Sequence, residues 1–224
     1  MAIISFHLNE NLFLRDPQNS ELGQNIIRHS ITLIDEIGFE QFTFKKLADK
    51  IDSTEASIYR YFENKHRLLV YLIDWYWTWM DYTMDFAMQN LLTPEERLRA
   101  GLRVIIEEKK LDPNFAFVDE QALQRIVMSE FDKTYLTKQV DLDNKEGLFI
   151  PYKTVCNKLA CEIKKVNPAY PHPHTLISTT MLSANHQVFY AKHLPSLTDI
   201  TGEKQVPYQK LYEFCEALIF NSIK

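Results

Sequence analysis

The stretch "GFEQFTFKKLADKIDSTEASIYRYFENKHRLL", residues 38–69, carries the clearest local pattern in the chain. Thr43 is a good N-cap for a short helix whose apolar side chains repeat on one face. The "DST" at residues 52–54 is typical of a tight turn, after which Ser53 or Thr54 caps the next helix. Two helices of about two turns each, joined by so short a turn, have the dimensions of a helix-turn-helix.

Longer helices are predicted on both sides of this pair. Residues 17–36 repeat isoleucines at helical spacing, with Asp16 as the N-cap and Gly38 as the end of the helix. Asn64 is suited to cap a helix of about six turns that is apolar around most of its girth. Its apolar stripe is Leu68, Leu72, Trp75, Trp79, Tyr82 and Phe86, and its narrow polar face is Asp74, Thr78, Asp81 and Asp85. A helix of this kind must lie inside a helical bundle.

The rest of the chain also favours helices. Five glycines among 224 residues are too few for an architecture of tight hairpins. Further helices are predicted near 94–110, 118–131, 151–165, 174–193 and 207–222, with "DLDNKEG" among the connections. The sequence therefore predicts an all-α fold, in which a three-helix helix-turn-helix domain precedes a larger helical bundle. The expected boundaries are 1–66, including an N-terminal extension at 1–16, and 67–224.

Composition and charge narrow the classes of function. The apolar content of 46% supports a sizeable core, and the net charge of −5 argues against a protein that coats nucleic acid or anionic membrane. Three cysteines without a spacing pattern, together with no signal peptide or membrane span, predict a cytoplasmic protein that does not enter a membrane. No metal-ligand spacing or catalytic constellation is visible. We therefore expect no metal, no cofactor and no enzymatic activity.

Residues 38–69 resemble the DNA-binding segment of TetR-family transcriptional repressors. The residues in register with that family's pattern are Gly38, Thr43, Leu47, Ala48, Thr54, Ala56, Ser57, Ile58, Tyr59, Tyr61, Phe62, Lys65 and Leu68. The resemblance covers about fifty residues, from the first helix to the start of the fourth. It implies a ligand-responsive DNA-binding regulator, a repressor that binds a palindromic operator in double-stranded DNA as a homodimer. It also implies that the second domain binds a small molecule and dimerises through its last two helices.

The predicted DNA-contacting residues have physical roles of their own. Ile58 and Phe62 lie four apart and pack inward, so that Thr54, Ser57 and Tyr61 face outward together. Short hydroxyls let a helix enter the major groove, and Glu55 is able to accept from a cytosine amino group. Thr43, Tyr59 and Lys65 are predicted phosphate ligands, although Tyr59 also fits a core edge and Lys65 a solvated surface. The full set is Thr43, Lys45, Lys46, Thr54, Glu55, Ala56, Ser57, Tyr59, Arg60, Tyr61 and Lys65.

Three features depart from the family pattern. Asp52 stands where a glycine is frequent, and Ser53 stands where an apolar residue is usual. The N-terminal extension contains a single base, Arg15, so a basic arm in the minor groove is not expected. Ile4, Phe6 and Leu8 alternate instead, as residues that pack against a neighbouring element do.

Candidate residues in the second domain fall into two groups. Aromatic and histidine side chains suited to an apolar or planar effector are Trp75, Trp79, Tyr82, Phe131, Tyr135, Phe149, Tyr152, His186 and Tyr190. Faces suited to a dimer interface are Ile177, Met181, Ala184 and Val188 on one helix, and Leu211, Phe214 and Leu218 on the last. Both groups also fit an ordinary intramolecular core.

A second class of function stays open at this point. A helical ligand carrier or interaction protein can retain a helix-turn-helix shape without binding DNA. The acidic Glu55 and a local charge of only +2 between Thr43 and Arg67 favour that alternative. Salt-dependent binding to DNA distinguishes the two classes.

Overall fold

The computed structural model describes residues 5–115, 117–202 and 206–224, and within these ranges every regular element is a helix. The chain forms two compact units: unit 1, Met1–Trp79 with Lys109–Pro151, and unit 2, Met80–Glu108 with Tyr152–Lys224. Helix α4 (Lys65–Met88) contributes residues to both units. The predicted all-α fold, with a helix-turn-helix domain before a larger helical part, is confirmed. The predicted division by role after residue 66 stays a prediction.

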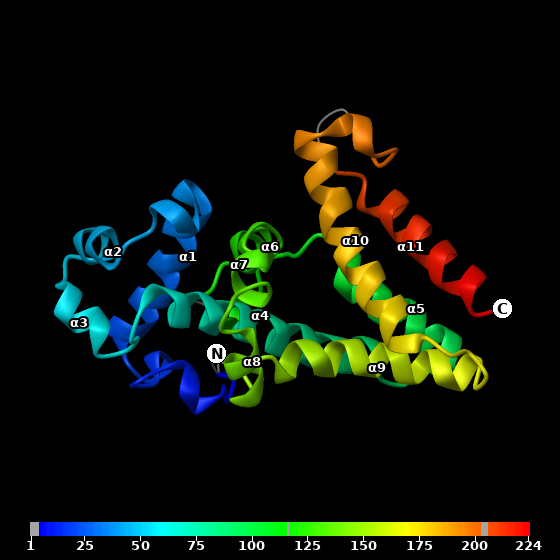
Figure 1. Ribbon diagram of the computed structural model, residues 1–224, viewed down its shortest axis with the longest axis horizontal. Coiled ribbons are helices and arrows are strands. Elements are labelled where there is room, and N and C mark those ends of the chain that lie inside the picture. The colour runs from blue at the N-terminus through cyan, green and yellow to red at the C-terminus, as the bar shows by residue number, and fades with distance from the viewer. Residues whose placement is uncertain (1–4, 116, 203–205) are drawn as a thin grey trace. The chain divides into compact units, whose positions relative to one another are not determined.

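Helices α1 (Glu21–Gln41), α2 (Phe44–Lys50) and α3 (Glu55–Tyr59) form the N-terminal part of unit 1, coloured blue to cyan in Figure 1. Ser20 caps α1 through its side-chain oxygen, which accepts from the amide of Gly23 at 3.1 Å. The predicted cap Asp16 belongs instead to a short 3-10 helix, η2 (Pro17–Asn19). Gly38 interrupts α1 with a φ of 75°, a left-handed conformation that glycine adopts at little cost.

The remainder of unit 1 surrounds the first half of α4. It contains η1 (Glu10–Leu12), η3 (Pro113–Phe115), α6 (Glu120–Ser129), α7 (Phe131–Tyr135) and α8 (Val140–Lys145). The ring of Phe6 lies 5.4 Å from that of Trp75 and 5.1 Å from that of Phe115, and Leu8 is buried. The N-terminal extension therefore packs against its own chain, as its alternating residues predict. Ile4, the third of them, lies outside the described residues.

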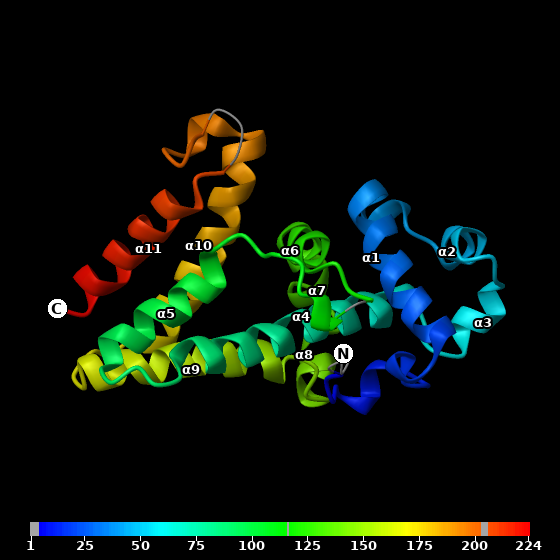
Figure 2. The ribbon, with the colours of Figure 1, turned by 180° about the vertical axis from the view of Figure 1, so that it is seen from behind.

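Unit 2 contains the end of α4 with α5 (Pro94–Ile106), most of α9 (Ile150–Val166), α10 (Pro173–His193), η4 (Pro195–Leu197) and α11 (Tyr208–Ser222). A capping box starts α5, because Thr93 and Glu96 each bind the other's backbone amide. A Cβ atom at Gly101 would lie 2.4 Å from Leu159, so α5 and α9 approach closely there. Helices α10 and α11 lie side by side and run in opposite directions (Figures 1 and 2).

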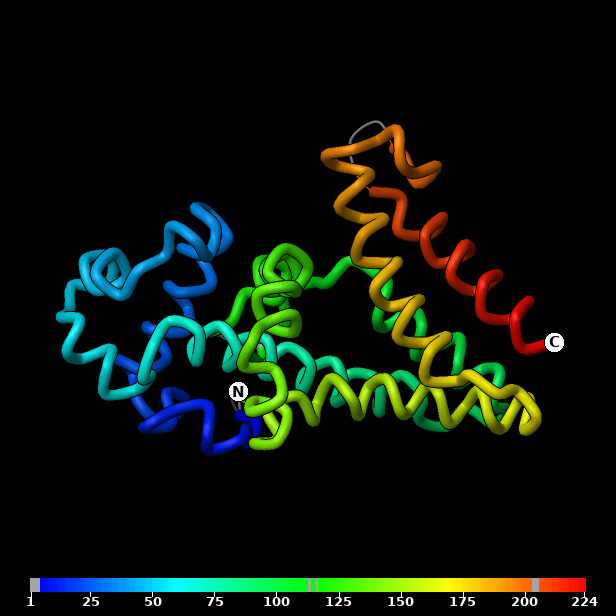
Figure 3. Tube along the Cα trace, viewed as in Figure 1, coloured from blue at the N-terminus to red at the C-terminus, as the bar shows by residue number. Residues whose placement is uncertain are grey.

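Several helical boundaries differ from the sequence prediction, and two of the differences concern unit 1 after α4. The helix predicted over 118–131 ends at Ser129, and the separate helix α7 follows it. The segment "DLDNKEG", predicted as a connection, contains all of α8 except its first residue, Val140, and the turns of α8 can be followed in Figure 3. Asp143 is the buried residue of α8, and it pairs with side chains of α4. Charged contacts rather than apolar ones hold α8 in place. Its sequence therefore lacks the periodic apolar residues from which a helix is predicted.

Among the described residues, no helix is both long enough and apolar enough to cross a membrane.

Candidate DNA-binding surface

Two capped helices and a tight turn build the candidate surface. The Thr43 hydroxyl accepts from the amide of Lys46, and the Thr54 hydroxyl accepts from the amide of Ser57, each at 3.2 Å. Between the helices, Asp52 takes a φ of 51°, a left-handed conformation that glycine adopts most readily and that aspartate tolerates better than most residues. Both predicted caps are therefore present, with Thr54 rather than Ser53 starting the second helix.

Apolar side chains fix the orientation of α3. Ile58 and Phe62 are both fully buried. Their burial turns the opposite side of α3 to solvent, where Thr54, Glu55 and Ala56 are exposed. Ser57 is half-buried, and its hydroxyl lies 3.0 Å from that of Thr54. The exposed side of α3 thus presents small and hydroxylated residues, which allow close approach to the edges of bases.

Basic and phenolic side chains flank that helix. Lys45, Lys46 and Arg60 are exposed, and the Lys46 ammonium donates to the backbone oxygen of Gln41 at 2.8 Å. Tyr59 is 48% exposed, and its ring packs edge-on against Phe44 with 5.0 Å between ring centroids. The ring of Tyr59 therefore packs at the edge of the core while the side chain stays accessible. Its hydroxyl group is suited to donate a hydrogen bond to a phosphate oxygen.

Tyr61 does not face outward as predicted. It is 2% exposed, and its hydroxyl lies 2.8 Å from that of Ser20, the cap of α1. The guanidinium carbon of Arg15 lies 5.3 Å from its ring centroid. The prediction extended the helical spacing from Thr54 to this position, but α3 ends at Tyr59. Beyond that residue the 3.6-residue period no longer gives the direction of a side chain.

Lys65 is also occupied within the protein. Its ammonium donates to the backbone oxygens of Phe39 and Phe42 at 3.1 Å and to that of Glu40 at 3.4 Å. It also lies 4.7 Å from the centroid of the Phe39 ring. A lysine has three N–H donors, so these carbonyls can use all of them. Lys65 thus holds the connection between α1 and α2. To bind a phosphate, its ammonium would have to release one of these carbonyl oxygens.

The local charge is distributed unevenly. Lys50 pairs with Glu36 at 2.9 Å, and Arg67 pairs with Asp143 and Glu146. Lys65 is held by carbonyls, so apart from the paired Lys50 the exposed bases of this segment are Lys45, Lys46 and Arg60. The positive charge therefore lies beside α3 and not over the whole helix-turn-helix.

The predicted effector residues are separated by unit. Within unit 1, Tyr135 links Phe131 and Phe149, with ring centroids 4.5 Å and 5.0 Å apart, and the rings of Trp75 and Trp79 stack. Tyr82, Tyr152, His186 and Tyr190 belong to unit 2. Burial of Tyr152 raises the pKa of its phenol to about 12. His186 is exposed on α10, and its Nδ1 lies 2.9 Å from the backbone oxygen of Leu182.

The predicted dimer residues need a correction. Ile177, Met181, Ala184, Val188 and Leu211 are all at most 3% exposed in the single chain, so they form the core of unit 2. Phe214 is 46% exposed, and Leu218 is half-buried. The exposed apolar residues of α10 are Leu182 and Phe189. Both helices carry apolar residues on more than one face, and sequence spacing alone selected the inner face of α10.

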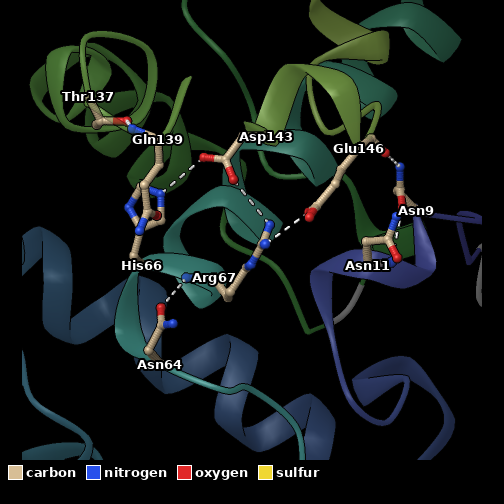
Figure 4. Close-up of polar contacts among 9 residues, drawn as sticks. All are labelled: Asn9, Asn11, Asn64, His66, Arg67, Thr137, Gln139, Asp143 and Glu146. Atoms are coloured by element: carbon tan, nitrogen blue, oxygen red, sulfur yellow. Dashed lines mark hydrogen bonds and ion pairs between the residues drawn. The ribbon is translucent and has the colours of Figure 1, made fainter. Parts of the chain in front are cut away.

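The sequence prediction missed the roles of two residues of α4, Arg67 and Asp74. Arg67 in its first turn binds Asp143 and Glu146, and Asn9 donates to the backbone oxygen of Glu146 at 2.9 Å (Figure 4). Asp74, predicted on a polar face, is 4% exposed and lines a pocket. The contacts of Arg67 join residues more than seventy positions apart, which helical periodicity does not report. An aspartate in an otherwise apolar helical stretch was the one available signal for Asp74.

Comparisons with known proteins agree with this geometry. The family model described as "Bacterial regulatory proteins, tetR family" matches residues 26–72, which span most of α1, all of α2 and α3, and the start of α4. No curated protein matches the chain.

Solved structures share the fold across nearly the whole chain. A tetR-family regulatory protein from Rhodococcus RHA1 is 12% identical, with a TM-score of 0.64, and covers 90% of this chain and 98% of its own. The fatty acid degradation regulator FadR from Bacillus halodurans is 16% identical, with a TM-score of 0.63, and covers 90% and 95%. AibR, solved with isovaleryl coenzyme A and operator DNA, is 17% identical, with a TM-score of 0.57, and covers 88% and 98%.

Proposed function

The chain carries the DNA-binding domain and the fold of the TetR family of bacterial regulators, and from this premise we propose that it is a ligand-responsive repressor. It binds a palindromic operator as a homodimer and releases that operator when an effector binds. The observation that carries the proposal is the solvent-facing side of α3, where Thr54, Glu55 and Ala56 are exposed beside Lys45 and Arg60.

Contacts with DNA divide into two kinds. Thr43, Lys45, Lys46, Tyr59 and Arg60 bind phosphates and fix the register of the domain. Thr54, Glu55, Ala56 and Ser57 meet the base edges, where the Glu55 carboxylate accepts from a cytosine amino group and so contributes specificity more than affinity. Tyr61 and Lys65 support DNA binding indirectly, by fixing the helices that carry the contacts. Tyr61 is buried against Ser20, and Lys65 holds the α1–α2 connection.

Dimerisation uses the outer faces of α10 and α11. Leu182, Phe189 and Phe214 are 38%, 44% and 46% exposed, although each is large and apolar. A two-fold axis that brings two copies of such helix pairs together makes a four-helix interface and buries these side chains. The two helix-turn-helix heads of such a dimer read half-sites related by the same symmetry, which is why the operator is palindromic.

The effector acts by a population shift. It binds more tightly to the arrangement that does not fit the operator, and the difference in affinity sets how far DNA binding weakens. This regulatory role makes no use of a catalytic step, and an enzymatic activity is not proposed.

A salt series of gel shifts with the DNA that flanks the gene tests the proposal. Binding should weaken steeply with added salt, with a logarithmic slope of about −0.9 for each phosphate neutralised. The variant with both Lys45→Ala and Arg60→Ala should bind more weakly and show a shallower slope, by about two for each protomer.

Matched control changes are Lys138→Ala with Lys145→Ala, which remove two exposed bases from unit 1 outside the helix-turn-helix. They should leave both affinity and slope unchanged. Absence of a salt-dependent shift, or equal effects of the two double variants, would remove the basis of the proposal and favour a helical ligand carrier.

A further inference from the structure

A pocket of about 280 Å³ lies within unit 1, apart from the candidate DNA-binding surface. Three segments line it: the N-terminal extension, the middle of α4, and the connection from α8 to α9. Its lining residues are His7, Leu8, Asn9, Glu10, Asp74, Thr78, Gly147, Ile150 and Pro151. This volume lies just below the range of about 300–1,000 Å³ that is usual for ligand pockets, so a ligand here would have to be small.

Asp74 is the unusual member of this set. It is 4% exposed, and no described residue donates a hydrogen bond to its Oδ1. The Thr78 hydroxyl one turn later donates to the backbone oxygen of Asp74 at 2.8 Å and not to the carboxyl group. Burial raises the pKa of the Asp74 carboxyl to about 8. A buried carboxyl oxygen without a hydrogen-bond donor is destabilising, and carboxyls with strongly raised pKa values cluster at functional sites.

The lining selects the chemistry of the ligand. Asp74 and Glu10 are acidic, His7 is the one basic side chain among the nine, and Leu8, Ile150 and Pro151 supply apolar walls. A group that donates hydrogen bonds and carries positive charge would satisfy Oδ1 and favour the ionised carboxylate. A short apolar chain attached to that group would contact the apolar walls.

The same pocket wall is tied to the start of α4. Asn9, which lines the pocket, donates to the backbone oxygen of Glu146, the residue before Gly147. The Glu146 carboxylate receives a hydrogen bond from Arg67 at 2.9 Å, and Arg67 also contacts Asp143 (Figure 4). Arg67 lies two residues after Lys65, which holds the α1–α2 connection. A ligand that moves Asn9 or Gly147 would therefore act on the helix that begins directly after the helix-turn-helix.

We propose that this pocket binds a small organic ammonium ion, a protonated amine with a short alkyl chain, whose N–H groups donate to Asp74. The apolar portion lies against Leu8, Ile150 and Pro151, and Glu10 adds attraction at the rim. The inference deepens the proposed effector response, and it rests on that function only for the step from binding to release of DNA.

Calorimetric titration of the full chain with hexylammonium chloride tests the binding step without DNA. Wild-type protein should bind hexylammonium with one site and bind uncharged 1-hexanol far more weakly. Asp74→Asn keeps the shape of the side chain and removes the carboxyl that ionises when the ammonium binds, so its affinity for hexylammonium should fall about tenfold or more. Asp141→Asn, an exposed acid of α8 in the same unit, is the matched control and should bind as wild type does.

Equal binding of hexylammonium by wild type and Asp74→Asn would overturn the inference, as would equal binding of the amine and the alcohol. If Asp74→Asn does not fold, amide resonances of the wild-type protein replace it. Those of Asn9, Thr78 and Gly147 should shift on titration, and shifts confined to other regions would also refute the site. A failed amine titration beside an intact salt-dependent gel shift removes this inference alone, whereas a failed gel shift removes the proposed function.

Discussion

The guanidinium of Arg67 lies 3.3 Å from the carboxylate of Asp143, a side chain that is 1% exposed. His66 approaches the same carboxylate at 3.4 Å, and Arg67 also reaches Glu146. Removing one partner of a buried ion pair leaves the other charge without compensation, which is more damaging than losing an exposed pair. Ion pairs therefore hold the first turn of α4 against α8.

We expect Arg67→Ala to lower the free energy of unfolding by about 3 kcal/mol, because it leaves Asp143 buried beside His66 alone. Urea denaturation followed by circular dichroism measures the change. The control is Arg125→Ala, which breaks an exposed pair with Asp35 and should lower stability by less than about 1 kcal/mol. Equal losses would show that Asp143 keeps sufficient partners without Arg67.

Lys65→Met should lower stability by about 2 kcal/mol, because charge-assisted hydrogen bonds to three carbonyls are lost while most of the unbranched side chain is kept. DNA affinity should fall with it, but the dependence of affinity on salt should keep its slope. Gel shifts across a salt series measure both quantities. A slope that becomes shallower by about one for each protomer would instead identify Lys65 as a phosphate ligand.

The pH dependence of stability should report Asp74. Its pKa rises from 3.8 to about 8 on folding, so the folded chain keeps a proton that the unfolded chain releases. The contribution of this protonated carboxyl to stability is fully present below about pH 4 and is lost as pH rises toward 8, by about 6 kcal/mol at most. Asp74→Asn should match wild type near pH 4 and exceed it near pH 8, as measured by urea denaturation.

Other titrating groups lie near Asp74 and remain in that variant. His7 and Glu10 line the same pocket, and Tyr71 lies one turn earlier on α4, where burial and then the charges of Asp16 and Asp74 raise its pKa. Glu120, whose pKa burial raises to about 7, also loses stability over part of this range. The difference between Asp74→Asn and wild type isolates Asp74, and a constant difference at all pH values would contradict its titration.

The double variant Phe189→Glu with Phe214→Glu should convert the proposed dimer to a monomer, because it places charge on the exposed apolar residues of α10 and α11. Sedimentation velocity measures the change in mass. Leu136→Glu, in a residue of unit 1 that is 73% exposed, is the control and should stay dimeric. A dimer that survives the double variant would place the interface elsewhere on the chain.

Sequence reasoning succeeded where one local rule decided the outcome. Thr43, Thr54 and Thr93 act as the caps that their positions indicate, and Ile58 is buried on the inner face of α3 as its helical position requires. These features depend on residues within one or two turns of each other, so the sequence displays them directly.

It failed where a distant contact or a helix end intervened. Tyr61 turns inward because α3 has already ended, and its partner Ser20 lies 41 residues earlier. Met181 and Val188 belong to the core of unit 2, although the spacing of α10 equally fits an outward face. Which of two apolar faces is buried depends on the neighbouring helices, and the sequence of a single helix does not determine it.

The hydrogen bond from Asn9 to Glu146 joins positions 137 residues apart. During synthesis, α1, α2 and α3 are complete long before the ribosome reaches that partner, and their mutual contacts are local in sequence. The segment Met80–Glu108 of unit 2 also emerges before unit 1 receives Lys109–Pro151. Domains fold as units during synthesis, so the hydrogen bond of Asn9 forms only after the middle of the chain has been made, whereas Phe6 can contact Trp75 earlier. A nascent chain that ends before α8 therefore lacks the contacts of Arg67 with Asp143 and Glu146.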